Sequence, residues 1–176
     1  MQTVNEKKLK AFLEAHPIPE QLTTDKRKRM YMDDRSIINF KLTSEESNGS
    51  LSITEFYLMK GNEPPRHIHE FVDETFMIHD GIVNYYVGDK IITAGTGDVV
   101  FVPKMEPHHF KLVSDSAIVS TIFAPGYYDH YFWYFSRPMD QENIQLTNMT
   151  PEELIKWNKE SAVFGTVFVD VVKKSK

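Results

Sequence analysis

The amino-acid sequence predicts an all-β domain in which antiparallel strands form a barrel or sandwich, with a short helix at each end. Between about residues 35 and 124, short segments alternate apolar and polar residues, and a period of two is typical of strands. The pairs Asn48-Gly49, Asp80-Gly81 and Gly88-Asp89 separate some of these segments and favour tight hairpin turns. No helical pattern lies between the segments, which excludes a parallel α/β sheet because its strands need crossover helices.

The first expected element is an amphipathic helix over residues 5–16. Leu9, Phe12 and Leu13 share one face of this helix, and Pro17 ends it. The expected strands follow at nearly even spacing, which is typical of an antiparallel barrel or sandwich. They cover 36–42, 51–59, 66–70, 74–79, 82–87, 90–93, 98–102, 108–114 and 117–123.

The chain changes character after the last of these strands. Seven aromatic residues occupy the nine positions of Tyr127–Phe135, which we call the aromatic segment, and we expect it to pack on the barrel or on a second copy of the chain. Thr150, Pro151 and Glu153 are typical of a helix start with a capping box, and this helix should run to about residue 161. Val163–Val172 then resembles an edge strand.

Composition favours one globular domain over residues 1–176. Of the 176 residues, 41% are apolar and 26% are charged. The formal net charge of −5 argues against broad binding to nucleic acid, which needs a basic face. The polar N-terminus and the lack of an apolar run of about 18 residues predict a cytoplasmic protein without a membrane span.

The cysteine and histidine counts point to a metal site made of nitrogen and oxygen ligands. The chain has no cysteine, which excludes thiolate zinc sites, iron–sulfur clusters and a cysteine nucleophile. Five of the seven histidines fall within residues 67–109, although even spacing would place about two there. On a strand, His67 and His69 project from the same face and can reach one ion. Neutral imidazole suits Fe, Mn, Co, Ni, Cu or Zn.

Strand phase selects a carboxylate to accompany these histidines. Three acids follow them closely in the sequence: Glu70, Asp73 and Glu74. Glu74 alternates in step with Phe76 and Ile78, so it shares their inward face, whereas Asp73 faces outward and Glu70 belongs to a turn. Glu74 is therefore the predicted ligand, and it could also act as a base.

The same argument separates the other histidines. His108 is in phase with apolar residues of its strand, whereas its neighbour His109 faces the other way. His79 is out of phase as well, and His16 lies outside the strand region. His130 lies in the aromatic segment and could reach the mouth of a pocket.

These residues resemble the two cupin motifs. Gly61-x5-His67-x-His69-x4-Glu74-x6-Gly81 has every spacing of the first motif. Gly97-x5-Pro103-x4-His108 is similar to the second motif, although Met105 and Leu112 replace its usual glycine and asparagine. The resemblance covers about residues 35–124. It implies a cupin (jelly-roll) β-barrel with one divalent transition metal ion (Fe, Mn, Ni, Co or Zn), held by His67, His69, Glu74 and His108.

A narrower resemblance is to the quercetinase-like monocupins. It rests on Pro64-Pro65-Arg66 before the first histidine, on Ala124-Pro125-Gly126 before the aromatic segment, and on a late helix that ends near a Phe-Gly strand. It implies a dioxygenase that acts on a flavonol or a similar aromatic or enol substrate, with Glu74 as metal ligand and catalytic base.

Two other functions stay open. One is a metal-dependent isomerase of a sugar or keto acid, and the other is a small-molecule-binding cupin without catalysis. No helix-turn-helix pattern follows the barrel, so a transcription factor would lack its DNA-binding half. We expect the partners to be a small-molecule substrate and a second copy of the chain, which would form a homodimer through an outer strand and the aromatic segment.

Overall fold

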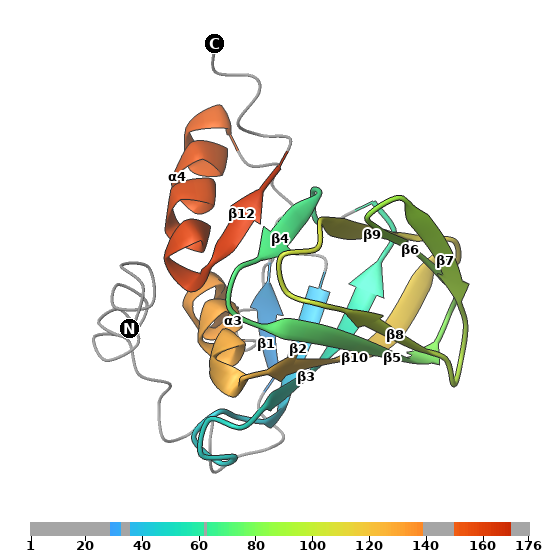
Figure 1. The fold of residues 1–176 in the computed structure, drawn as a ribbon, viewed down its shortest axis with the longest axis horizontal. Helices are drawn as coiled ribbons and strands as arrows, with labels where there is room; N and C mark the ends of the chain where they lie inside the picture. The colour runs from blue at the N-terminus through green and yellow to red at the C-terminus, as the bar shows by residue number, and fades with distance from the viewer. Residues whose placement is uncertain (1–28, 33–35, 62, 139–149, 170–176) are drawn as a thin grey trace.

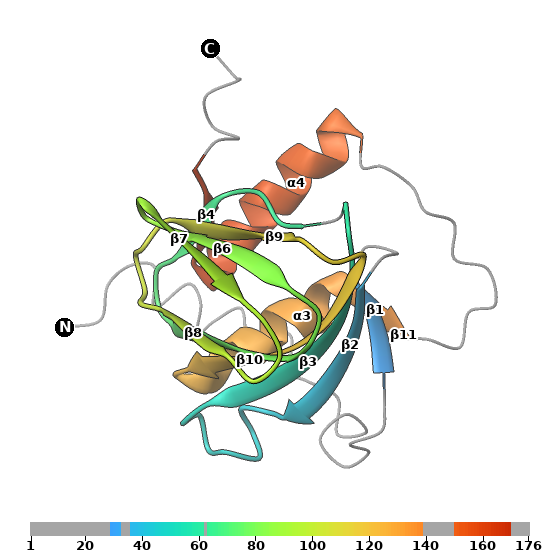
Figure 2. The ribbon, with the colours of Figure 1, turned by 90° about the vertical axis from the view of Figure 1, so that its right-hand side faces the viewer.

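Two antiparallel sheets face each other and form the body of the protein (Figures 1 and 2). The structure is a computed structural model, and it describes residues 29–32, 36–61, 63–138 and 150–169. The expected N-terminal helix over residues 5–16 lies outside this part of the chain. The all-β fold class predicted from the sequence is confirmed.

The strands alternate with short turns along most of the described chain. They are β1 (Arg29–Met32), β2 (Ser36–Leu42), β3 (Ser52–Met59), β4 (His67–His69), β5 (Asp73–Asp80), β6 (Val83–Val87), β7 (Lys90–Ala94), β8 (Val99–Val102), β9 (His108–Leu112), β10 (Ser116–Ala124), β11 (Ser136–Pro138) and β12 (Thr166–Phe168). The helices are the 3-10 turns η1 (Gly126–Tyr128) and η2 (Ala162–Phe164) and the α-helices α3 (Asp129–Phe135) and α4 (Pro151–Ser161).

The order of the strands explains how distant segments meet inside the barrel. One sheet has the order β11-β1-β2-β3-β10-β5-β8, and the other has the order β12-β4-β9-β6-β7. From β4 to β10 the chain therefore crosses repeatedly between the two sheets, as in a jelly roll. Because β4 and β5 belong to opposite sheets, side chains on their inner faces approach each other across the interior.

All nine strands expected between residues 35 and 124 are present. The largest difference is at β9, which ends at Leu112 instead of residue 114. In β5 the alternation of burial follows the predicted phase, because Glu74, Phe76 and Ile78 are buried, whereas the first four residues of β7 are all exposed. Local alternation is a good predictor here because one face of each sheet packs inward and the other contacts water.

Two of the three expected hairpin turns are corrected by the topology. Gly88 and Asp89 do form the two-residue loop between β6 and β7, where Val87 pairs with Lys90. At Gly81, however, the chain passes from one sheet to the other, since β5 pairs with β8 and β10 and not with β6. Asn48-Gly49 lies within a longer connection between β2 and β3, although both residues do have positive φ.

The segment expected as an edge strand over Val163–Val172 is also corrected. Its first residues form η2, which ends at Gly165 with φ of +78°. Only Thr166–Phe168 form a strand in the described part of the chain, and this strand is the edge of its sheet beside β4. The left-handed conformation at Gly165 turns the backbone out of the 3-10 helix, so a continuous strand cannot form across it.

The aromatic segment packs within its own chain. Tyr128, Tyr131 and Phe132 are buried together with Phe56 and Phe123 in one of the two core clusters. Tyr127, in contrast, is 44% exposed. A second, separate core cluster includes Phe76, Val83 and Tyr85. The expected homodimer stays a prediction.

Helix α4 begins as the sequence predicted. The Thr150 side chain accepts a hydrogen bond from the Glu153 backbone N–H at 3.2 Å, and the Glu153 carboxylate accepts one from the Thr150 N–H at 2.7 Å. The ring of Trp157 lies 4.3 Å from that of Phe168, so α4 packs against β12.

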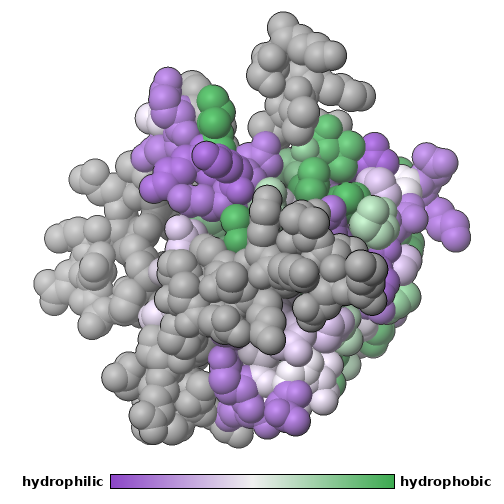
Figure 3. Space-filling view, turned by 60° about the vertical axis from the view of Figure 1, so that its left-hand side comes forward, coloured by the Kyte–Doolittle hydropathy of each residue, from purple (hydrophilic) through white to green (hydrophobic). Residues whose placement is uncertain are grey.

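Figure 3 shows this side of the molecule, where hydrophilic side chains gather beside smaller hydrophobic areas. Among the described helices, none is long and apolar enough to span a bilayer.

Replacing Gly81 should destabilise the fold more than replacing Gly97. Both glycines have positive φ, +88° and +92°, which costs an L-residue about 1–2 kcal/mol. A Cβ at Gly81 would lie 2.6 Å from the carbonyl oxygen of Ser116, whereas a Cβ at Gly97 would meet no described atom within 4 Å. We expect Gly81→Ala to lower the free energy of unfolding by about 1–3 kcal/mol more than Gly97→Ala in urea denaturation. Equal losses would contradict the close contact at Gly81.

Candidate metal centre

Two neighbouring strands of the smaller sheet present three histidines to the interior. His67 and His69 are both buried, and Ile68 between them is less so, as strand phase predicts. Strand β9 pairs with β4 so that His108 lies opposite His67. His108 is buried and its neighbour His109 is only half-buried, as strand phase predicts.

The fourth residue comes from the opposite sheet. Glu74 lies on β5 and is 6% exposed. Its Oε2 atom is 2.9 Å from His108 Nε2 and 3.2 Å from His69 Nε2. One ligand atom from each of the four residues lies within 4.8 Å of the others, so this cluster could hold a metal ion.

Backbone carbonyls orient two of the imidazoles. His67 Nδ1 lies 2.8 Å from the carbonyl oxygen of Pro65, and His108 Nδ1 lies 2.8 Å from that of Glu106. Because a carbonyl oxygen only accepts hydrogen bonds, each Nδ1 carries a proton and donates it. The Nε2 atom of each ring is therefore available to bind a metal ion.

The protonation of the cluster suits a divalent transition metal. Burial opposes the ionisation of Glu74, but the charges and hydrogen bonds of His69 and His108 hold its pKa below the ordinary range. Burial lowers the pKa of His67 and of His69, which favours the neutral form of both rings. Burial also opposes the protonation of His108, yet the hydrogen bond and charge of Glu74 raise its pKa. Neutral imidazoles beside a carboxylate are the ligand forms that Fe, Mn, Co, Ni and Zn accept.

The two acids not chosen from the sequence lie outside the histidine cluster. Asp73 Oδ1 accepts a hydrogen bond from the Lys104 backbone N–H at 2.8 Å. Glu70 follows β4, and its N–H donates to the carbonyl oxygen of Gly165 at 2.8 Å. Neither acid belongs to the buried cluster, in agreement with the choice of Glu74.

Two more histidines lie away from the centre, as strand phase predicted. His79 is exposed on the outer face of β5, and its Nε2 lies 2.7 Å from Ser120 Oγ. His109 stacks on Tyr86 with 4.5 Å between the ring centroids. His16 lies outside the described residues.

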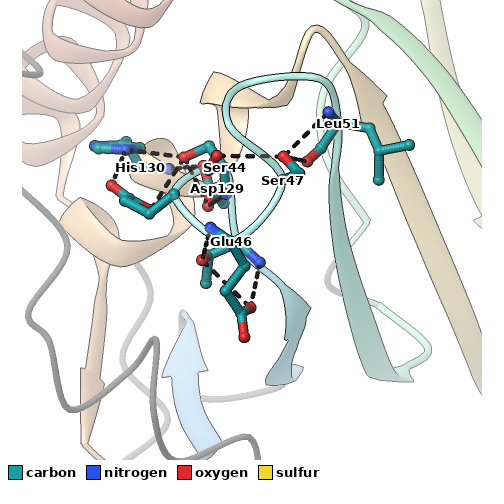
Figure 4. Close-up of polar contacts among 8 residues, drawn as sticks. Ser44, Glu46, Ser47, Leu51, Asp129 and His130 are labelled. Carbon is teal, nitrogen blue, oxygen red and sulfur yellow. Dashed lines mark hydrogen bonds and ion pairs between the residues drawn. The ribbon is translucent and has the colours of Figure 1, made fainter.

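His130 belongs to a separate polar cluster and not to the metal centre. Its Nε2 lies 3.2 Å from Ser44 Oγ and 3.0 Å from Glu45 Oε1, beneath the connection between β2 and β3 (Figure 4). The neighbouring Asp129 accepts hydrogen bonds from the N–H and hydroxyl of Ser44 at 2.7 and 3.1 Å. Burial raises the pKa of Asp129 to about 6, although His130 opposes this shift. The cluster joins α3 to this connection.

Three residues that the sequence argument did not select contact the ligands. The ring of Tyr128 lies 4.5 Å from that of His69, and Thr166 Oγ1 lies 3.3 Å from His69 Nδ1. The ring of Phe168 lies 5.7 Å from that of His67. For Tyr128 the sequence signal was the density of aromatic residues around it. Thr166 and Phe168 had no sequence signal, because the pairing of β12 with β4 joins positions almost a hundred residues apart.

The fold and the site define a small β-barrel with an internal histidine–carboxylate cluster, and comparison with known proteins agrees with the barrel fold. Residues 54–124 match the family model described as a cupin domain. This match and the fold support the cupin superfamily, as the two sequence motifs predicted. The finer resemblance to quercetinase-like monocupins stays a prediction. A search of the curated proteins finds no match to this chain.

Several solved structures share the fold at low sequence identity. KdgF from Halomonas sp. is 14% identical with a TM-score of 0.51, and the match covers 56% of this chain and 86% of that one. The Streptomyces nucleoside dehydratase Pac13 is 13% identical with a TM-score of 0.50, covering 65% and 88%. An HTH_3 family transcriptional regulator from Vibrio cholerae is 19% identical with a TM-score of 0.50, covering 65% and 62%. At these identities the likeness shows the fold alone.

Removing one imidazole should weaken metal binding strongly. We expect His69→Ala to lower the affinity for Co²⁺ or Mn²⁺ by more than the factor of about 10–100 typical for loss of an outer partner, because it deletes a ligand atom. His79→Ala is the matched control, since His79 lies on the outer face of the same region. Metal analysis after dialysis measures both variants. Equal occupancy in His69→Ala and the unmodified protein would mean that the ligand set is wrong.

Metal affinity should fall as the pH falls through the raised pKa of His108. A proton on His108 Nε2 competes with the ion, so binding is tightest above that pKa and weakens below it. Titrations from about pH 8.5 to about pH 5.5 span the ordinary imidazole value. With one proton displaced, affinity should fall about tenfold per pH unit in the lower part of this range. In Glu74→Gln the fall should begin at lower pH, because the carboxylate that raises the His108 pKa is gone. An affinity independent of pH would contradict this competition.

Proposed function

We propose that this protein is a metal-dependent cupin enzyme of dioxygenase type, acting on a small oxygen-bearing aromatic or enol substrate such as a flavonol. One observation carries the proposal. The carboxylate of Glu74 is buried and in contact with two of the histidines, His69 and His108, that would share the ion with it. A carboxylate in that place can ligate the ion and also take a proton from a substrate bound beside it.

The four residues of the cluster would have two roles, metal binding and proton transfer. His67, His69, Glu74 and His108 would hold one divalent ion, which when bound supplies a Lewis acid that makes a substrate hydroxyl more acidic. Glu74 would accept the proton of that hydroxyl on a carboxylate oxygen. The substrate would then be an electron-rich anion, to which both atoms of dioxygen could add. Glu74 would finally return the proton to the product.

The aromatic side chains around the centre favour the proposal that the substrate is planar and largely apolar. Phe123 lies 5.9 Å from the ring of His69, and Phe168 lies 5.7 Å from that of His67. Phe76 and Tyr85 form part of the core beyond Glu74. Burial and the charge of Glu74 raise the pKa of Tyr85, so its phenol stays protonated. Apolar walls of this kind exclude water from an electron-rich anion and favour contact with flat rings.

A second candidate function is a proton-transfer reaction without dioxygen, such as isomerisation of a sugar or keto acid. It is favoured by the 2.9 Å contact between Glu74 and His108. In such a pair the carboxylate can accept a proton as a base, and the protonated imidazole can donate one as an acid. The same four residues would hold the ion. The two candidates differ in whether oxygen is consumed.

Oxygen uptake separates these candidates. Metal-replete protein should consume one dioxygen per substrate molecule with a panel of flavonols and catechols. Glu74→Gln should lower kcat by a factor of about 10²–10⁴, the usual contribution of a general base. Asp73→Asn is the matched control, because Asp73 is the adjacent acid and bonds to a backbone N–H instead. Its kcat should stay within about twofold of the unmodified rate, since surface changes have small effects.

Three results would count against the dioxygenase assignment. Turnover without oxygen consumption would favour the isomerase. Substrate binding without turnover would favour a small-molecule-binding cupin. Full activity in Glu74→Gln would remove the proposed base. The cytoplasmic location and the homodimer stay predictions from the sequence.

A further inference from the structure

The three ligand histidines differ in what holds the nitrogen that faces away from the centre. For His67 and His108 the partner of Nδ1 is a backbone carbonyl two residues earlier in the chain. For His69 the partner is the hydroxyl of Thr166, at 3.3 Å. A carbonyl only accepts a hydrogen bond, whereas a hydroxyl can donate or accept. His69 is therefore the ligand whose outer nitrogen can be protonated or unprotonated without losing its partner.

Thr166 is placed for this contact by the edge strand β12. In the pairing of β12 with β4, Thr166 lies directly opposite His69. Its side chain is 1% exposed, so it has no access to bulk water. On the same strand Phe168 packs against Trp157 of α4, at 4.3 Å between ring centroids. Packing from α4 thus helps to hold the strand against the histidines.

Tyr128 completes a short chain of hydroxyls. Its phenol oxygen lies 2.5 Å from Thr166 Oγ1, and either atom can be the donor. Its ring lies 4.5 Å from that of His69 in an edge-to-face arrangement. Tyr128 is buried among aromatic residues of the first core cluster, which restricts its movement. When Thr166 reverses the direction of its hydrogen bond to His69, the phenol is adjacent to accept from it or donate to it.

We propose that Thr166, supported by Tyr128, is a positioning residue that lets His69 exchange between its two neutral tautomers as metal binds and leaves. The inference rests on the metal site of the proposed function. Without metal, His69 Nε2–H faces Glu74 at 3.2 Å and the Thr166 hydroxyl donates to Nδ1. With metal, the single imidazole proton would lie on Nδ1 instead of Nε2, so the ring neither gains nor loses a proton, and the Nδ1–H would donate to Thr166 Oγ1. The imidazole stays neutral in both states, and only the direction of the hydrogen bond changes.

Variants at residue 166 separate the hydroxyl from the shape of the side chain. Thr166→Val keeps the branched shape but removes the hydroxyl, whereas Thr166→Ser keeps the hydroxyl. Thr54→Val is the matched control, because Thr54 is equally buried and its hydroxyl has no hydrogen-bond partner among the described residues. Zn²⁺ affinity should fall about 10–100-fold in Thr166→Val, as for other outer partners of ligand histidines. It should stay within about threefold in Thr166→Ser and Thr54→Val, which keep that partner.

Tyr128→Phe tests the second hydroxyl of the chain. It should weaken Zn²⁺ binding less than Thr166→Val does, because Thr166 can still bond to His69 directly. Thermal unfolding of each variant without metal checks that the fold is retained. A Zn²⁺ affinity of Thr166→Val within threefold of the unmodified protein would overturn the inference.

Nitrogen NMR of histidine-labelled full-length protein reads the tautomers directly. In the unmodified protein, His69 should carry its proton on Nε2 without metal and on Nδ1 with Zn²⁺. The same tautomer in both states would overturn the exchange. Without metal, the Nδ1 resonance of His69 should move in Thr166→Val and stay in place in Thr166→Ser.

Zn²⁺ binding and the metal-free spectra together distinguish failure of the inference from failure of the metal site on which the proposed function rests. If the unmodified protein binds no Zn²⁺, the metal site and the tautomer exchange are both wrong. If it binds Zn²⁺ while Thr166→Val leaves the His69 resonances unchanged, the metal site stands and the positioning role of Thr166 is wrong.

Discussion

The contact of the Glu74 carboxylate with the imidazoles of His69 and His108 is the interaction on which the centre depends. An ionised carboxylate in a protein interior costs several kcal/mol in lost hydration, so it is retained only where close partners offset that cost. Here the partners stand on the opposite sheet, at 2.9 and 3.2 Å. The contact therefore couples the closure of the barrel to the assembly of the site, because neither sheet contains the whole ligand set.

Part of the surroundings of the histidines comes from segments that lie outside the matched cupin domain at residues 54–124. Tyr128 packs against His69, and Phe168 packs against His67. Trp157 of α4 in turn contacts Phe168. Aromatic side chains bury large areas with few rotatable bonds, so they hold the imidazole rings with little flexibility. The segments after the barrel thus have a structural part in the candidate site as well as in the core.

Local patterns in the sequence were sufficient to predict most of the barrel and the four candidate ligands. Alternation with a period of two is a property of neighbouring residues, and it separated His108 from His109 and Glu74 from Asp73. The same patterns misassigned Asp80-Gly81 to a hairpin. A glycine with positive φ is favoured both in a hairpin turn and where the chain crosses between sheets, so the residue type does not distinguish the two. They also overextended the last strand, since the turn at Gly165 interrupts an otherwise apolar run.

The sequence by itself determined the nine strands β2 to β10 and the buried positions of His67, His69, Glu74 and His108, but it did not predict β1 or β11. Only the tertiary structure decided that these residues meet from two sheets and that the hydroxyl of Thr166 lies within hydrogen-bond distance of His69. The physical reason is that burial on a strand repeats every second residue, so it can be predicted from neighbouring residues in the sequence. The partner of His69 is set by the pairing of β12 with β4 across 97 positions, and no local pattern records that pairing.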